Sequence, residues 1–460
     1  MRRLAVLLVA CPLAGCTVGP DYHRPAVESP PAFRYELAEA RDTANAAWWE
    51  QFGDPVLDSL IDEALARNLN VKIAAANVEQ AAAVLKQTRA PLYPQAGYGA
   101  TASGQRQNEK LGTIYAYDAL AGASWEIDLW GRVRRLSEAA RAQMFATEEA
   151  RRGVILSLVA TVASSYLQLR ALDEQLVIAT RTKEAYAQSV RLFELQFKYG
   201  VQPQMTVEQA RTQYETAAAA IPQLESEIAQ AENALSVLLG RNPGPIQRGK
   251  AIGALAMPDI PAGIPSQVLE QRPDIRQAEQ QLIAANAQIG AAKALYFPTI
   301  SLTGALGVAS IDLLNLFKGT PSGAWSYQGS IAGPIFTAGA IKGQVRQTEA
   351  ARKAAELGYA AAIQSAFADI DNALIARTKL VDQLAAERRL VAASREYRRL
   401  ARLQFDGGVA PYMTVLQAEQ QLFPAELNEV QLRASLFTAT VNVYKAMGGG
   451  WVSEAEKRTR

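Results

Sequence analysis

Two long runs of the sequence carry apolar residues at helical spacing and contain no proline. The first covers residues 133–198 and the second residues 341–404. In the first, apolar positions recur three and four residues apart, as at Ile155, Leu158 and Val162. A helix of that size is about 100 Å long, much longer than a compact core requires. Each long helix must therefore lie against other long helices.

Four shorter stretches alternate apolar and small polar residues with the period of a β-strand: residues 95–105, 115–130, 299–309 and 324–336. One face is apolar with aromatic residues, and the other carries polar groups such as Asp118. A soluble sandwich would give the same alternation, but hairpins flanked by such long helices have no second sheet to pack on. A membrane barrel satisfies both faces, and Trp125, Trp130 and Trp325 near the strand ends suit its aromatic girdle.

The chain repeats itself once. Residues 69–94 align with residues 273–298 without a gap, and residues 197–207 match residues 405–415. Each unit, 56–240 and 273–447, is predicted to run short helix, two strands, long helix, glycine turn and medium helix. The medium helices are expected at 203–239 and 411–447, and the short helix of the first unit at 56–89. Residues 241–272 and 448–460 lack a long helix, and we expect them to form an equatorial belt halfway along the rods.

Four strands cannot close a barrel in a membrane, because open edges leave backbone groups unsatisfied. Two copies would give eight strands, and a barrel that small is filled by side chains, whereas three copies would give twelve strands around an aqueous lumen. The sequence therefore predicts a homotrimer of mixed, mostly helical class. Its twelve-stranded β-barrel is continued by a barrel of long helices.

Composition and charge narrow the function. The 460 residues carry a formal net charge of +2, so no clustered basic surface for nucleic acid is expected. The N-terminus has Arg2 and Arg3 before an apolar run, and residues 1–15 are predicted to be a secretory signal too short to span a membrane.

The signal ends in Leu-Ala-Gly before Cys16, which resembles the bacterial lipobox. Residues 16–55 then form an extended segment that begins with a lipid-bearing cysteine. The resemblance implies delivery to the outer membrane, because Thr17 is not the aspartate associated with retention in the inner membrane. An ordinary export signal with an incidental cysteine is the alternative.

Several motifs together resemble the TolC-like outer-membrane factor family, in its NodT-like lipoprotein branch. They are residues 19–25 (GPDYHRP), 48–55 (WWEQFGDP), 125–132 (WEIDLWGR), 271–275 (QRPDI), 334–336 (PIF) and 447–451 (MGGGW). The resemblance implies the exit duct of a tripartite efflux system that conducts small molecules such as drugs. It also implies docking to a periplasmic adaptor (membrane fusion) protein and an inner-membrane proton-driven pump of the RND type. A duct for type I polypeptide secretion is the alternative within the family.

The resemblance also assigns roles to the glycine turns. They are expected to close the helical hairpins at the free end of the tunnel and to meet the adaptor there: Tyr199, Gly200 and Val201 in one turn, and Asp406, Gly407, Gly408 and Val409 in the other. Glycine also permits a left-handed backbone at such turns. Gate candidates on the returning helix are Met413, Gln417 and Gln420. Relatives often have an aspartate at the position of Gln417, so this departure bears on cation selectivity.

Enzymatic chemistry finds no support in the sequence. His23 is the only histidine, Cys16 is expected to carry lipid, and no phosphate loop or metal-ligand spacing occurs. Asp369 and Asp371 are two residues apart on a helix, so they point to different faces and are expected to serve packing or the lumen surface. We therefore expect a non-enzyme without cofactor or metal. A lipid-anchored periplasmic coiled-coil scaffold is the other alternative, although it would not need four amphipathic strands.

Overall fold

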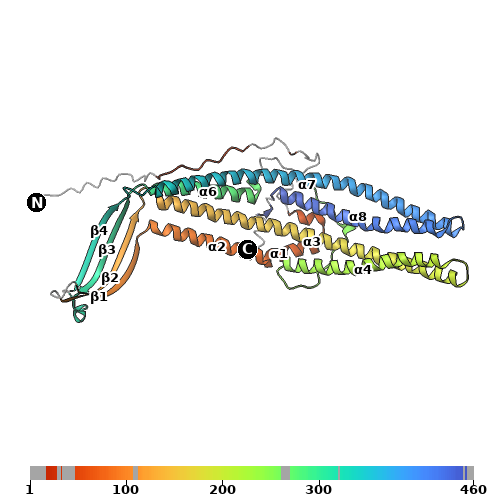
Figure 1. Cartoon of the computed structure of the whole chain (residues 1–460), viewed down its shortest axis with the longest axis horizontal. Coiled ribbons are helices and arrows are strands. Elements are labelled where there is room, and N and C mark those ends of the chain that lie inside the picture. The colour runs from red at the N-terminus through yellow and green to blue at the C-terminus, as the bar shows by residue number, and fades with distance from the viewer. Residues whose placement is uncertain are drawn as a thin grey trace. The chain divides into compact units, whose positions relative to one another are not determined.

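The computed structural model describes residues 17–27, 33, 47–106, 112–260, 270–319, 322–448 and 451–452. The chain divides into two compact units, and both halves of the sequence contribute to each (Figure 1). We call the first the strand unit; it comprises Met1–Val27, Ala76–Glu148 and Gln277–Ala361. The second, the hairpin unit, comprises Glu28–Ala75, Glu149–Arg276 and Ala362–Arg460.

The helices of the two halves have matching lengths. The α-helices are α1 (Pro55–Arg67), α2 (Leu69–Arg89), α3 (Arg132–Lys198), α4 (Gln204–Leu238), α6 (Pro273–Ala294), α7 (Ala340–Asp406) and α8 (Tyr412–Ala446). The 3₁₀ turns are η1 (Trp48–Phe52), η2 (Ala90–Leu92), η3 (Ile252–Ala254) and η4 (Leu313–Asn315). Helices α3 and α7 have 67 residues each, and α4 and α8 have 35 each. The medium helices begin one residue later than expected because Pro203 and Pro411 are extended N-cap residues.

The helix expected at residues 56–89 is in fact two helices, α1 and α2. Asn68 separates them, with an extended ψ of 129°. Its side-chain oxygen accepts hydrogen bonds from the N–H groups of Asn70 (2.8 Å) and Val71 (3.2 Å), while its amide donates to the carbonyl of Leu238 (2.8 Å). The prediction of one helix was wrong because an asparagine that caps the next helix ends the first one.

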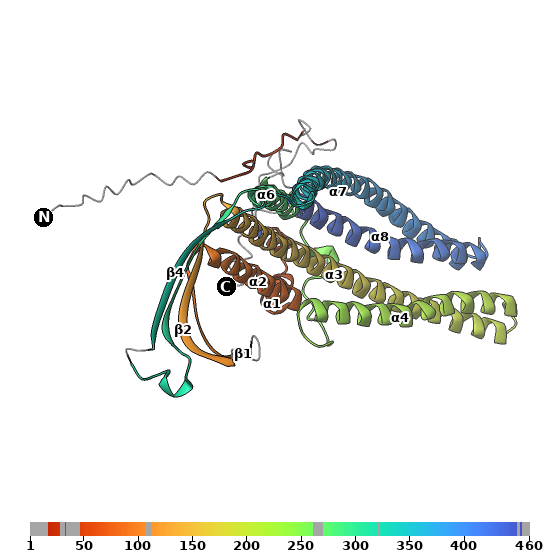
Figure 2. The same cartoon turned by 60° about the vertical axis from the view of Figure 1, so that its left-hand side comes forward.

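The strands form one antiparallel sheet in the order β1-β2-β3-β4 (Figure 2): β1 (Gln95–Arg106), β2 (Thr113–Ile127), β3 (Thr299–Ser310) and β4 (Gly323–Ala332). Strand β2 ends at Ile127 rather than at residue 130. The carboxylate of Asp128 accepts the N–H groups of Val133 (3.0 Å) and Arg134 (2.8 Å) and so begins α3. Strand β4 ends at Ala332 rather than at residue 336, since Pro334 has no N–H to continue the ladder.

The strand register sorts side chains cleanly between the two faces of the sheet. Leu302 pairs with Trp125, and Leu306 pairs with Trp325, so all four lie on one face. The neighbouring residue Thr303 pairs with Gln328 on the opposite, polar face. Large apolar side chains on the first face are bare in the single chain: Leu306 (68% exposed), Trp325 (76%), Tyr327 (80%) and Ile331 (73%). A sheet with a dry face needs a cover, and none of the described residues supplies one.

The core of the hairpin unit surrounds the middle of α3. Among the described residues, α3 is the one helix long and apolar enough to cross a membrane, but its apolar stretch is 67% buried by the protein. Ile155, Val159 and Tyr166 of α3 are fully buried with Trp48 and Trp49 of η1. This apolar stretch of α3 is therefore covered mainly by the protein itself.

Candidate functional site

The two glycine turns have the same backbone hydrogen bonds. Gly200 has φ 72°, and the N–H of Val201 donates to the carbonyl of Gln196 at 2.8 Å. Gly408 also has φ 72°, and the N–H of Val409 donates to Gln404 at 2.9 Å. A left-handed glycine followed by a bond that reaches back five residues is the Schellman ending of a helix. Glycine is needed at both positions because other residues rarely adopt this φ.

The two helical hairpins pack on each other beside these turns. The ring of Phe193 on α3 lies 4.1 Å, centre to centre, from the ring of Tyr412 on α8, and 6.0 Å from that of Phe405 on α7. The turn residues themselves are open to solvent: Tyr199 is 72% exposed, and Val409 is 81% exposed. Apolar side chains left bare on a well-packed base are typical of a contact surface.

The gate candidates share one face of α8. Met413, Gln417 and Gln420 are all exposed, and their spacing of four and three residues places them on one side of the helix. The opposite side holds Val415 and Ala418, which are buried in a cluster with residues of α3, α4 and α7. The structure therefore places the three candidates on one exposed face, and all three side chains are uncharged.

The three tryptophans of the expected girdle have different environments. Trp325 on β4 is exposed and stacks on Tyr327 with a ring separation of 5.9 Å. Trp125 on β2 is half-buried and donates its indole N–H to the carbonyl of Leu92 at 3.1 Å. Trp130 lies beyond the end of β2 and donates to the carbonyl of Pro298 at 2.7 Å. Such amphipathic rings, with one polar bond and an apolar body, are those favoured at membrane interfaces.

The segment after the predicted lipid site is docked onto the strand unit. The N–H of Val18 donates to the carbonyl of Trp130 at 3.1 Å, and Arg135 pairs with Asp21 at 2.8 Å. Farther along, Arg24 donates from Nε to Glu279 at 2.7 Å. Gly19 packs so closely that an added Cβ would lie 2.4 Å from the Cα of Gly290. Cys16 itself lies outside the described residues, but the chain that follows it is fixed to the base of the sheet.

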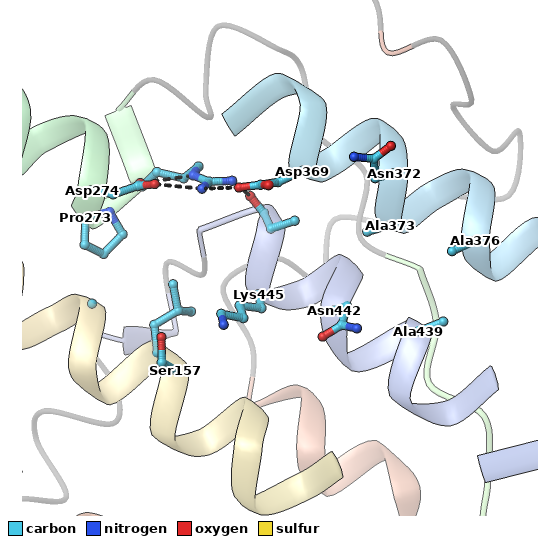
Figure 3. A pocket seen from close by; sticks show the side chains of 14 residues that line it. Ser157, Pro273, Asp274, Asp369, Asn372, Ala373, Ala376, Ala439, Asn442 and Lys445 are labelled. Atoms are coloured by element: carbon cyan, nitrogen blue, oxygen red, sulfur yellow. Dashed lines mark hydrogen bonds and ion pairs between the residues drawn. The ribbon is translucent and has the colours of Figure 1, made fainter. Parts of the chain in front are cut away.

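Asp369 takes part in an ion pair between helices (Figure 3). The buried guanidinium of Arg272 donates to Asp369 at 2.9 Å, to Asp274 at 2.7 Å and to the carbonyl of Ala446 at 2.9 Å. This set joins α6, α7 and α8 at the edge of a cavity of about 470 Å³. In the sequence, the motif QRPDI indicated only the resemblance to a family and did not predict these bonds of Arg272. Among the described residues, no group of three or more His, Cys, Asp or Glu side chains could hold a metal ion.

Comparison with known proteins identifies the family of this chain. A family model described as "Outer membrane efflux protein" matches residues 60–241 and again residues 264–449. The chain belongs to the outer membrane efflux protein family. The two matches lie in the two halves of the sequence, in which repeated segments are found.

Relatives in this family are similar over almost their whole length. The chain is 37% identical to the cation efflux system protein CusC of Escherichia coli O6:H1, over 98% of this chain and 99% of that protein. It is 38% identical to the probable outer membrane lipoprotein SilC of Salmonella typhimurium, over 96% and 97%. It is 36% identical to the probable efflux pump outer membrane protein TtgC of Pseudomonas putida, over 98% and 96%.

Solved structures agree with this assignment. A crystal structure of CusC matches with a TM-score of 0.87 at 36% identity, covering 94% of this chain and 100% of that one. The open state of the Neisseria gonorrhoeae MtrE outer membrane channel matches with a TM-score of 0.88 at 35% identity, covering 95% and 99%. The chain is thus an efflux channel protein of the outer membrane, in a family of channels rather than enzymes.

Proposed function

We propose that three copies of the chain form one duct, in which twelve strands close a membrane barrel and the long helices continue it into the periplasm. The observation that carries this proposal is the sheet. Its apolar face is bare, and β1 and β4 are edge strands with no further partner among the described residues. Pooling strands satisfies the edges, and lipid covers the apolar face. The two-fold sequence repeat then supplies two hairpins and four strands from each copy.

The partners follow from the same arrangement. The turn residues, from Tyr199 to Val201 and from Asp406 to Val409, form the surface that meets a periplasmic adaptor, which in turn joins an inner-membrane RND-type pump. Exposed apolar side chains at both turns support this role. Cargo passes through without chemical change, so no cofactor is needed. The cargo is proposed to be small molecules, since similar proteins are named for cation efflux and for toluene efflux.

Reconstitution tests the duct directly. We expect the full mature chain, extracted in mild detergent, to run as a trimer and to give stepwise ion conductance in planar lipid bilayers. A trimer is expected because four strands leave two open edges that only further copies can pair. The measurement is mass by light scattering followed by single-channel recording. A monomer that gives no conductance would favour the coiled-coil scaffold instead.

We also propose that Cys16 carries the lipid that anchors the chain. The docked segment from Thr17 onward supports this, because a lipid on the residue before it would anchor a chain that is held against the strand unit. We expect radiolabelled palmitate to be incorporated into the native chain, and the Cys16→Ser variant to lose the label completely, since serine has no thiol to receive the acyl-bearing lipid group. His23→Gln, a change in the same exposed segment, is the matched control and should keep the label. Label retained by Cys16→Ser would reject the assignment.

A further inference from the structure

Helix α8 carries a buried carboxylate that bridges two other helices of the hairpin unit. The Glu426 side chain is 8% exposed, and it accepts from Arg181 of α3 at 3.1 Å and from Arg395 of α7 at 2.9 Å. Charge-assisted hydrogen bonds of this kind are roughly twice as strong as neutral ones. Glu426 therefore ties α8 to both α3 and α7.

Seven residues earlier on α8, a second carboxylate has no such partner. Glu419 is half-buried, and its Oε2 has no hydrogen-bond donor among the described residues. Its backbone carbonyl, however, accepts from the hydroxyl of Tyr186 on α3 at 3.3 Å. Glu419 and Glu426 both line a cavity of about 380 Å³ between α3, α7 and α8. An ionised carboxylate without a donor is costly in such a place, whereas the neutral acid is not.

Burial of Glu419 outweighs the positive charges around it. Burial raises the pKa of Glu419 to about 7, and the positive charges of Arg398 and Arg402 on α7 only partly oppose this. The other titratable or charged groups around the cavity come from all three helices: Arg181 and Tyr186 of α3, Arg395 of α7, and Tyr412 and Glu426 of α8. Arg181 and Arg395 are already engaged by Glu426, so neither is free to neutralise a second carboxylate.

We propose that Glu419 is a proton-operated latch: its neutral acid keeps α3 and α8 packed, and its ionised form favours their separation toward solvent. The same helix presents Met413, Gln417 and Gln420, so release of α8 would move the gate candidates. That link to gating rests on the proposed duct, but the latch itself is a property of the helix packing.

The direction of the pH effect follows from proton binding. The packed arrangement, in which burial raises the pKa of Glu419, binds the proton more tightly than a separated one with an ordinary glutamate pKa. Proton binding therefore stabilises packing at low pH, and this contribution is lost as the pH rises toward the raised pKa. The ratio of separated to packed forms is expected to rise at least about tenfold between about pH 5.5 and pH 7.5 and then to level off.

Thiol labelling measures this opening without relying on conductance. Ser189 on α3 is 8% exposed and lies on the same helix face as Tyr186 and Phe193, which both contact α8. In a trimer with Ser189→Cys, we would measure labelling by an uncharged thiol reagent across this pH range. Dividing the rate by that of the same protein carrying Glu419→Gln cancels the reagent's own pH dependence. Ala434→Cys, buried on α8 about 22 Å from Glu419 along the helix, is the control position.

The expected result is a labelling ratio at Ser189→Cys that rises about tenfold with pH, while the ratio at Ala434→Cys stays constant. A ratio at Ser189→Cys that does not change with pH would overturn the latch. A similar rise at both positions would also overturn it, because it would indicate general loosening. Loss of trimers or of conductance in the native chain would instead contradict the proposed duct, so the two failures are distinguishable.

Discussion

Leu306→Arg is expected to abolish insertion of the channel into the outer membrane. Leu306 lies on β3, between Ala121 and Trp325 of the neighbouring strands, and is 68% exposed on the apolar face. An arginine on the lipid face of a membrane barrel costs about 2–4 kcal/mol at mid-depth, and a trimer would incur this cost three times. The measurement is the amount of heat-resistant trimer in isolated outer membranes, which we expect to fall at least about tenfold.

Thr303→Arg is the matched control for this substitution. Thr303 is on the same strand, is also exposed, and faces the polar side with Gln328. An arginine there would lie in water inside the proposed barrel, so trimers should assemble at nearly the native level and only conductance should change. Equal loss of trimers in both variants would show that the apolar face does not meet lipid. Equal tolerance of both would lead to the same conclusion.

Alternation along the strands made this face predictable from the sequence. In a strand, alternate side chains point to opposite faces, so the apolar residues mark the face that avoids water. The observed register agrees with this assignment, because Leu302 pairs with Trp125 on the apolar face. The turn glycines were predictable for a similar local reason, because Gly200 and Gly408 both have the left-handed backbone that the sequence suggested. Features that depend on one local segment of the chain can thus be predicted from the sequence.

Features set by contacts between distant segments were not predictable in this way. The break at Asn68 depends partly on the hydrogen bond that its side-chain amide donates to the carbonyl of Leu238, which is 170 residues away in the sequence. Arg272 was noted only as part of a motif, although it joins three helices through Asp274, Asp369 and Ala446. Glu426 gave no signal at all, because a glutamate in a long helix is usually solvated and its two arginine partners lie on other helices.

The interleaving of the two sequence halves explains why these contacts matter. Each compact unit takes residues from both halves of the sequence. Some buried side chains of the hairpin unit accordingly have partners in the other half of the sequence. Glu426 does so through Arg181 of α3, and the tryptophans of η1 do so by packing with Tyr444 and Trp451 near the C-terminus.

Among the substitutions proposed in the hairpin unit, Asp54→Ala is expected to lower the free energy of unfolding the most. Asp54 is fully buried at the start of α1 and accepts hydrogen bonds from Val56 N–H (3.0 Å), the Tyr166 hydroxyl (2.8 Å) and Lys250 N–H (3.1 Å). Alanine would leave the buried Tyr166 hydroxyl and the two backbone N–H groups without this acceptor. At about 1–3 kcal/mol for each unsatisfied group, the expected loss is about 4 kcal/mol.

Denaturant unfolding in detergent, followed by fluorescence of the buried tryptophans Trp48 and Trp49, measures this loss as a shift of the midpoint. Tyr166→Phe removes one of the three donors and should cost about 1–2 kcal/mol, since Asp54 keeps its two backbone bonds. Asp382→Ala is the surface control: Asp382 is 69% exposed in a pair with Lys379, and its loss should change stability by less than about 0.5 kcal/mol. If Asp54→Ala and Asp382→Ala shifted the midpoint equally, the hydrogen bonds of Asp54 would not stabilise the packing of η1 and α1 on α3. Asp54 would then act only as the N-cap of α1.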